Sequence, residues 1–189
     1  MLHPIPRLIF ATDSDMNRTR SVTFLTYEEY LNIGGITGYG NYDVSKEQDG
    51  SITAWYELDA SSSLERNWYI APTASNITIA ADEDCTFMFG TYSQEDWTYS
   101  GFQAIYNFEL VDMKNVKYVD NMFLNCKYLE GSITLKNFNP NMSYSAFEQL
   151  GYSSNGVTIY SYGGTAAIIQ DMLNSCFNNV MYGGERTEL

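Results

Sequence analysis

A short hydrophobic anchor that recurs along the chain constrains its fold more than any other feature. Phe87-Met88-Phe89 returns as Asn121-Met122-Phe123 and, in a weaker form, as Ser145-Ala146-Phe147. The second interval is 24 residues and the first is 34, because a polar and aromatic insertion lies around 93–100. A short unit that repeats every 20 to 30 residues or so is typical of a solenoid, in which each unit buries its apolar face against the next.

Segments between and around these anchors are expected to be short strands. Residues 108–116 and 133–139 both alternate apolar and polar residues before an Asn-containing turn. Further strands are expected at 7–11, 21–25, 51–58, 67–70, 76–80 and 156–160. Residues 38–50 are expected to form a polar turn region that ends in the hairpin signal Asp49-Gly50.

Two helices are expected. Thr26 and Glu29 have the spacing of a capping box, which predicts a short helix to about Ile33, although the same residues could continue a strand. Thr165 could cap a second helix that places apolar residues on one face as far as Cys176. A terminal strand and an amphipathic helix would close a solenoid.

The run 119–129 resembles the N-M-x-x-M-F-x-x-C-x-x-L unit of BspA-like leucine-rich-repeat surface proteins, a unit also found in mycoplasma lipoproteins. Residues 108–110 and 133–138 fit the strand of that family. The stretches 52–56 and 68–72 look like its preceding strand pair, and 157–160 with the helix to Cys176 like its closing unit. The resemblance covers roughly residues 50–180. It implies a non-enzymatic extracellular binding role and supplies no functional residues.

Together these patterns predict a mainly β, β-rich α+β chain with a short leucine-rich-repeat-like solenoid. The length of 189 residues suits one domain, or one domain with an appended layer. We expect an N-terminal β segment or arm over 1–50, and a repeat domain with a capping strand and helix over 51–189.

Charge and residue counts exclude several functions. The formal charge of −13 repels nucleic acids and anionic lipids, so neither is expected as a partner. No apolar run approaches the ~18 residues of a spanning helix, and residues 1–12 do not read as a signal peptide. His3 is the sole histidine, which removes most histidine-dependent catalysis, and no cofactor is expected.

Cysteines and carboxylates offer few catalytic or metal-binding signals. Cys85, Cys126 and Cys176 are far apart, so we expect three free, buried thiols and neither a disulfide framework nor a zinc site. The acidic run 82–84 lacks the ligand spacing and glycine of a calcium loop, and is expected to be a solvated turn. Glu95 and Asp96 beside Trp97 suggest a glycosidase only if a cleft holds the two carboxyls apart.

The insertion is the predicted binding site. Its aromatic rings would recognise a partner if they project from the solenoid edge, because rigid rings bury area at low entropic cost. The alternative is that they fold back as a lid on the preceding strands. The candidate binding residues are Tyr92, Glu95, Asp96, Trp97, Tyr99 and Phe102.

The leading function hypothesis is therefore a surface-displayed binding or adhesion module, not an enzyme, that recognises a protein or a glycan. It would be found at the cell surface, outside the cell or on a virion. An alternative is a phage structural component of the tail, baseplate or head surface, with neighbouring virion proteins as partners. A glycan-acting hydrolase is the third hypothesis.

Overall fold

The computed structural model describes residues 2–5, 18–61, 64–90 and 102–189, and the side chains of all of these but 2–5. The described chain is mainly β, as predicted, with few helical residues. Its elements are β1 (Leu2–Ile5), β2 (Thr19–Phe24), α2 (Tyr27–Asn32), β3 (Tyr39–Asp43), β4 (Ile52–Leu58), β5 (Arg66–Pro72), β6 (Thr78–Ala81), β7 (Ala104–Tyr106), the 3-10 helix η1 (Phe108–Leu110), β8 (Gly131–Lys136), β9 (Val157–Tyr162), α3 (Ala166–Ser175) and β10 (Val180–Glu185).

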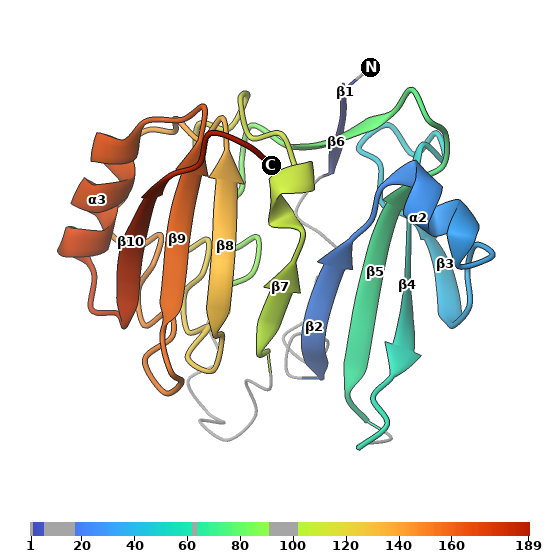
Figure 1. The fold of residues 1–189 in the computed structure, drawn as a ribbon, viewed down its shortest axis with the longest axis horizontal. Helices are drawn as coiled ribbons and strands as arrows, with labels where there is room; N and C mark the ends of the chain where they lie inside the picture. Colours follow the sequence, from blue (N-terminus) through green and yellow to red (C-terminus); the bar gives the residue numbers. More distant parts are fainter. Residues whose placement is uncertain (1, 6–17, 62–63, 91–101) are drawn as a thin grey trace.

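One half of the molecule is a five-stranded sheet of order β3-β4-β5-β2-β7 (Figure 1). The pairs β3-β4 and β4-β5 are antiparallel, whereas β2 is parallel to both β5 and β7. Helix α2 lies in front of this sheet in Figure 1 and covers it through Tyr30, whose ring is 5.8 Å from that of Trp55. The opposite face belongs to the main core, with Phe24, Ile52 and Ile70 fully buried.

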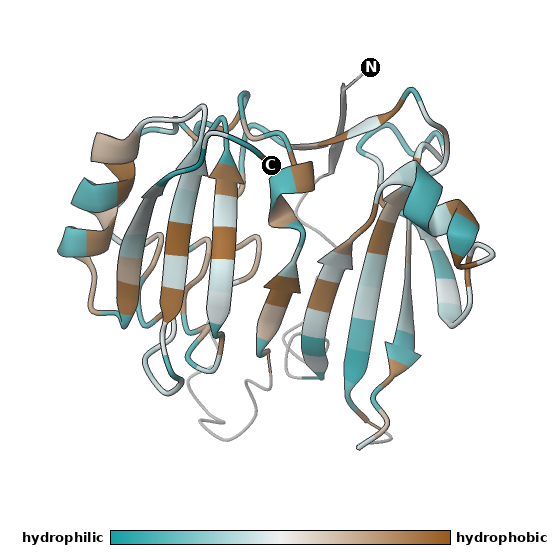
Figure 2. Cartoon of the chain, in the orientation of Figure 1, coloured by the Kyte–Doolittle hydropathy of each residue, from teal (hydrophilic) through white to brown (hydrophobic). Residues whose placement is uncertain are grey.

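The other half is built from parallel strands. Strand β9 lies between β8 and β10, and β1 pairs with β6. Single parallel bridges from Asp112 to Ala80 and to Lys136 connect β6 with β8. Hydrophobic and hydrophilic residues alternate along β8 and β9 in Figure 2. In β9 buried residues alternate with half-buried ones, so one face lies in the core, whereas Ile133, Thr134 and Leu135 of β8 are all buried. Helix α3 packs beside β10 and buries Ile169, Met172 and Leu173.

The three predicted anchors lie on top of one another in the core. The ring of Phe123 stacks on Phe89 at 5.3 Å and on Phe147 at 5.7 Å, with ring planes within 17° and 12°. The Phe89 amide donates to the Met122 carbonyl, and the Phe123 amide to the Ala146 carbonyl, both at 2.8 Å. Seven apolar side chains of the anchors and of the segments between them are buried, as expected for units that bury an apolar face: Met88, Phe89, Met122, Phe123, Leu129, Leu135 and Phe147.

The backbone repeats its conformation around these anchors. Phe87 and Asn121, which occupy the same position in two anchors, both have φ of +57°. Asn125 and Gln149, each two residues after an anchor phenylalanine, have φ of +62° and +61°. Non-glycine residues seldom adopt this left-handed conformation. This conformation therefore recurs at two pairs of equivalent positions, although their side chains differ.

Several local predictions are confirmed. Thr26 and Glu29 form the capping box of α2, with the Glu29 amide donating to Thr26 Oγ1 at 3.2 Å and the Thr26 amide to Glu29 at 2.7 Å. The closing helix forms as α3 with Thr165 at its N-cap position, but the Thr165 side chain makes no capping hydrogen bond. Its hydroxyl donates instead to Asn139 Oδ1 at 2.8 Å. The strand predicted at 7–11 lies outside the described residues.

Other local predictions are wrong. Residues 39–43 form β3 rather than a turn, η1 replaces the strand predicted to begin at Phe108, and β10 was not predicted.

The segment 1–50, expected to be an N-terminal β segment or arm, contains β2 and β3. Strand β2 lies between β5 and β7, and β3 pairs with β4 across residue 50, so this β segment shares one sheet with strands of the following segment.

Candidate functional site

The predicted binding loop can be located only in part. Tyr92, Glu95, Asp96, Trp97 and Tyr99 lie outside the described residues. Phe102 is 2% exposed, and its ring stacks on Phe89 at 5.9 Å. Of the two alternatives for the aromatic residues of the insertion, projection into solvent therefore does not hold for Phe102, which packs inward. Burial in the core against the Phe89 ring stabilises it more than projection into water would.

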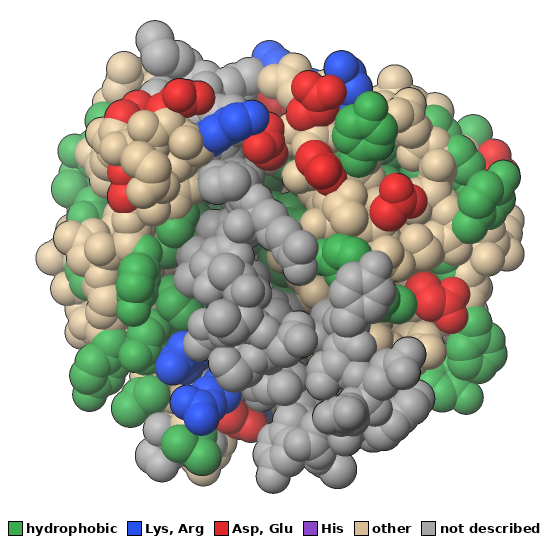
Figure 3. Space-filling model, turned by 180° about the vertical axis from the view of Figure 1, so that it is seen from behind, with side chains coloured by type: hydrophobic (Ala, Val, Ile, Leu, Met, Phe, Trp, Pro, Cys, Tyr) green, Lys and Arg blue, Asp and Glu red, His purple; other side chains and the backbone are tan. Residues whose placement is uncertain are grey.

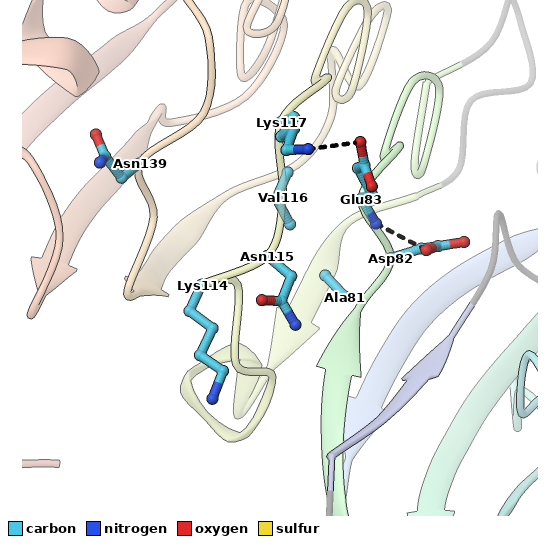
Figure 4. Close-up of a pocket in the computed structure, with 8 residues that line it drawn as sticks. All are labelled: Ala81, Asp82, Glu83, Lys114, Asn115, Val116, Lys117 and Asn139. Atoms are coloured by element: carbon cyan, nitrogen blue, oxygen red, sulfur yellow. Dashed lines mark hydrogen bonds and ion pairs between the residues drawn. The ribbon is translucent and has the colours of Figure 1, made fainter.

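A polar groove of about 500 Å³ lies across the turns that follow the parallel strands (Figure 4). Its walls are residues 81–83, 114–117 and Asn139. Asp82 forms an ion pair with Lys46 at 2.7 Å, and Glu83 one with Lys117 at 3.0 Å. Among the described residues no group of three or more His, Cys, Asp or Glu side chains could hold a metal ion.

Backbone hydrogen bonds join the turns that line this groove. The Glu83 carbonyl accepts from the amides of Lys117 and Tyr118 at 2.8 and 3.1 Å, and the Lys117 carbonyl accepts from the Asn141 amide at 3.0 Å. Successive turns are thus hydrogen-bonded to one another beneath the ion pairs. We conclude that two of the three carboxylates of the predicted acidic turn are paired with lysines, Asp82 with Lys46 from the connection between β3 and β4 and Glu83 with Lys117 from the neighbouring turn.

The three cysteines are free, as predicted. Burial raises the pKa of the Cys85 thiol to about 12, and burial also raises the pKa of Cys126. Cys126 Sγ donates to the Phe89 carbonyl at 3.3 Å. Cys176 is half-buried rather than buried, with Sγ 3.2 Å from the Tyr144 carbonyl. The raised pKa values leave little thiolate in Cys85 and Cys126, which suits packing rather than nucleophilic catalysis.

A cluster of aromatic side chains lies on the sheet at β3, β4 and β5. We call it the aromatic face, and define it as Tyr39, Tyr42, Tyr56, Arg66 and Trp68. Tyr39 lies opposite Tyr56 on the neighbouring strand, and Tyr56 lies opposite Trp68 on the next. Residues opposite each other in paired strands point to the same side of the sheet. The antiparallel register therefore brings the three rings together in one row.

The rings of the aromatic face are in mutual contact. Tyr39 stacks on Tyr56 at 5.6 Å with ring planes 23° apart, and the Arg66 guanidinium lies 4.6 Å from the Tyr56 ring centroid. Trp68 contacts Tyr56 at 4.9 Å and Tyr42 at 5.8 Å in tilted arrangements. Trp68 is buried, whereas 58% of Tyr39 and 46% of Tyr42 remain exposed. The buried Trp68 thus supports Tyr42 directly, and it supports Tyr39 through the ring of Tyr56.

A glycine on β3 makes room for one of these rings. A Cβ on Gly40 would lie 2.1 Å from Cε2 of Tyr42, and Gly40 has φ of +83°. The Tyr42 ring thus lies across the backbone of its own strand, in the space that a side chain at position 40 would occupy. The positive φ also favours glycine at this position. From behind, Figure 3 shows hydrophobic side chains gathered at this edge of the five-stranded sheet, close to basic ones.

Charged residues border the end of β4 and β5. Arg20 pairs with Glu65 at 2.7 Å and with Asp59 at 3.5 Å. Hydrogen bonds from the hydroxyl and amide of Ser61 and from the Asn67 side chain lower the pKa of Asp59 to about 2. Asp59 therefore stays ionised throughout the physiological pH range, so its ion pair with Arg20 persists there.

Sequence reasoning missed the aromatic face. Gly38, Gly40 and the Asp49-Gly50 pair made residues 38–50 resemble a turn region. One signal for this face was available in the sequence. Tyr56 and Trp68 lie on either side of a predicted turn, and an antiparallel hairpin pairs residues placed in this way.

No helix in the described part of the chain is long and apolar enough to cross a membrane. Comparison with protein-family models, curated proteins and solved structures finds no match to this chain, so the site itself must carry the functional argument.

Proposed function

We propose that this protein is a non-enzymatic binding module that is displayed on a surface and recognises a protein or a glycan. The observation that carries the proposal is the aromatic face, where the half-exposed Tyr42 contacts the buried Trp68 and the half-exposed Tyr39 stacks on Tyr56. Tyrosine contributes large, rigid contact area at low cost in side-chain entropy, and it is enriched in binding surfaces. Rings that are already held by their neighbours lose little further freedom on binding.

We also propose that residues from about 78 to 185 form a short stack of leucine-rich-repeat-like units, as in BspA-like surface proteins. The parallel strands, the bridges through Asp112 and the stacked Phe89, Phe123 and Phe147 rings support this proposal. In such an architecture each unit contacts mainly its neighbours. The stack would then hold the five-stranded sheet, and with it the aromatic face, in a fixed position.

The function is tested with a double variant, Tyr39→Ala with Tyr42→Ala, and a matched control, Tyr118→Ala with Tyr144→Ala. The control removes two tyrosines that are 48% and 74% exposed outside the aromatic face. Binding of wild type and both variants is measured on a glycan microarray and on an array of purified extracellular proteins. Thermal melting of each variant checks that the fold is retained.

We expect the wild type and the control variant to bind the same ligands, and the aromatic-face variant to lose them at an unchanged melting temperature. Truncating a ring at the centre of an interface often costs ~2 kcal/mol or more, which is well over tenfold in affinity. Equal binding by the two variants, or binding by neither of them, would show that the aromatic face is not the recognition surface.

A further inference from the structure

We propose, resting on the proposed function, that the aromatic face binds an uncharged glycan, with one sugar ring on Tyr39 and a neighbouring one on Tyr42. The C–H bonds on one face of a sugar ring pack on an aromatic ring, while its hydroxyls at the rim remain free for hydrogen bonds. A tyrosine offers both partners, since its flat ring ends in a hydroxyl that can donate and accept.

The two tyrosines are supported by different neighbours. Tyr39 ends a column in which the Arg66 guanidinium, the Tyr56 ring and the Tyr39 ring follow one another at 4.6 and 5.6 Å. The inner surface of Tyr39 is thus occupied by Tyr56, which leaves the outer one for a ligand. Tyr42 is held between Trp68 and the backbone at Gly40. Such pre-organised rings suit a ligand whose own binding energy is modest.

The spacing along the sheet suits adjacent units of a chain of sugars. Tyr39 pairs with Tyr56 and Tyr42 with Ala54 on β4. These two partners, Tyr56 and Ala54, are two residues apart on β4, and positions two residues apart on a strand are separated by roughly 7 Å. The two rings can therefore contact consecutive, or nearly consecutive, sugar rings of one linear glycan. A single sugar could occupy only one of them.

The amount of exposed surface favours a glycan over a protein. A stable protein interface covers about 800 Å² on each partner. The aromatic face offers two half-exposed tyrosines next to the 41%-exposed Leu58, which is a small part of such an area. A glycan needs only ring-sized platforms of this kind.

Charge favours a neutral ligand over an acidic one. The protein carries a formal charge of −13, and the carboxylates next to the aromatic face, Asp59 and Glu65, form ion pairs with Arg20. With its pKa lowered to about 2, Asp59 keeps this ion pair at any pH of interest. The net charge of the protein would repel uronic-acid and sulfated glycans, whereas it does not repel an uncharged glycan.

The test is affinity electrophoresis in gels that contain either a neutral polysaccharide (β-glucan, mannan or galactan) or an anionic one (polygalacturonate or dextran sulfate). We expect retardation by at least one neutral polymer, little change between about 0.05 and 0.5 M salt, and at least about tenfold weaker binding for Tyr39→Ala and for Tyr42→Ala. Tyr39→Phe, which keeps the ring, should retain most of the affinity. Tyr144→Ala serves as the exposed-tyrosine control.

Retardation by anionic polymers alone would overturn the glycan inference and leave the proposed function standing. The same holds if ligands are found only on the protein array and are lost in the Tyr39→Ala with Tyr42→Ala variant. Failure of every neutral polymer would likewise overturn the inference. Neutral-glycan binding that is unaffected by both single variants would overturn the inference together with the assignment of the aromatic face.

Discussion

Replacing Phe123 by alanine removes the middle ring of the three-ring stack in the core. Phe123 is fully buried and contacts Phe89 at 5.3 Å and Phe147 at 5.7 Å, so no solvent can enter to fill the space that the ring leaves. Substitutions of this kind cost about 3–5 kcal/mol through lost transfer free energy and the cavity that remains. For a chain of this length, each kcal/mol lowers the melting temperature by roughly 2–4 °C.

We therefore expect Phe123→Ala to melt about 6–20 °C below wild type. Thermal and urea unfolding can be followed by circular dichroism and by the fluorescence of the buried Trp55 and Trp68. Phe177→Ala is the matched control, because Phe177 is 59% exposed and its removal should change stability by no more than about 0.5 kcal/mol. A Phe123→Ala protein that melts within a degree or two of wild type would refute the stacked core.

Cys85 and Cys126 should resist alkylation until the protein is denatured, as followed by mass spectrometry under non-reducing conditions. Because the pKa of Cys85 is raised to about 12 from its ordinary 9.0, its contribution to stability should be lost as the pH rises above 9, and Cys85→Ala should flatten that part of the profile. Asp59→Asn should lower stability at neutral pH, with the difference from wild type shrinking below about pH 4 and vanishing near pH 2, because the native pKa of Asp59 is depressed to about 2; a difference independent of pH would contradict this. Gly40→Ala should destabilise more than Gly50→Ala and weaken ligand binding as well, since both glycines have positive φ but only at Gly40 would a Cβ collide with Tyr42; equal melting temperatures and affinities for these two variants would contradict the placement of the Tyr42 ring.

Features that depend on neighbouring residues could be predicted from the sequence. The capping box of α2 joins residues three apart, and strand β4 follows directly from its run of β-branched and aromatic residues. The burial of Met122 and Phe123 followed from a recurring anchor, because a repeated apolar position must face a shared core. The position of Phe102 could not be predicted in this way. Its place next to an insertion says nothing about the Phe89 ring on which it stacks.

The amino-acid sequence by itself determined a mainly β chain, an acidic surface and a core built on repeated aromatic anchors, because these depend on composition and local periodicity. Only the tertiary structure decided that β2 pairs with β5 and β7, since parallel partners are joined through long connections that carry no local signal. It likewise decided that Tyr39, Tyr56 and Trp68 share one face, because strand register sets which side chains meet. The candidate site arises from that register, whereas each of its tyrosines taken alone is an ordinary residue of a tyrosine-rich chain.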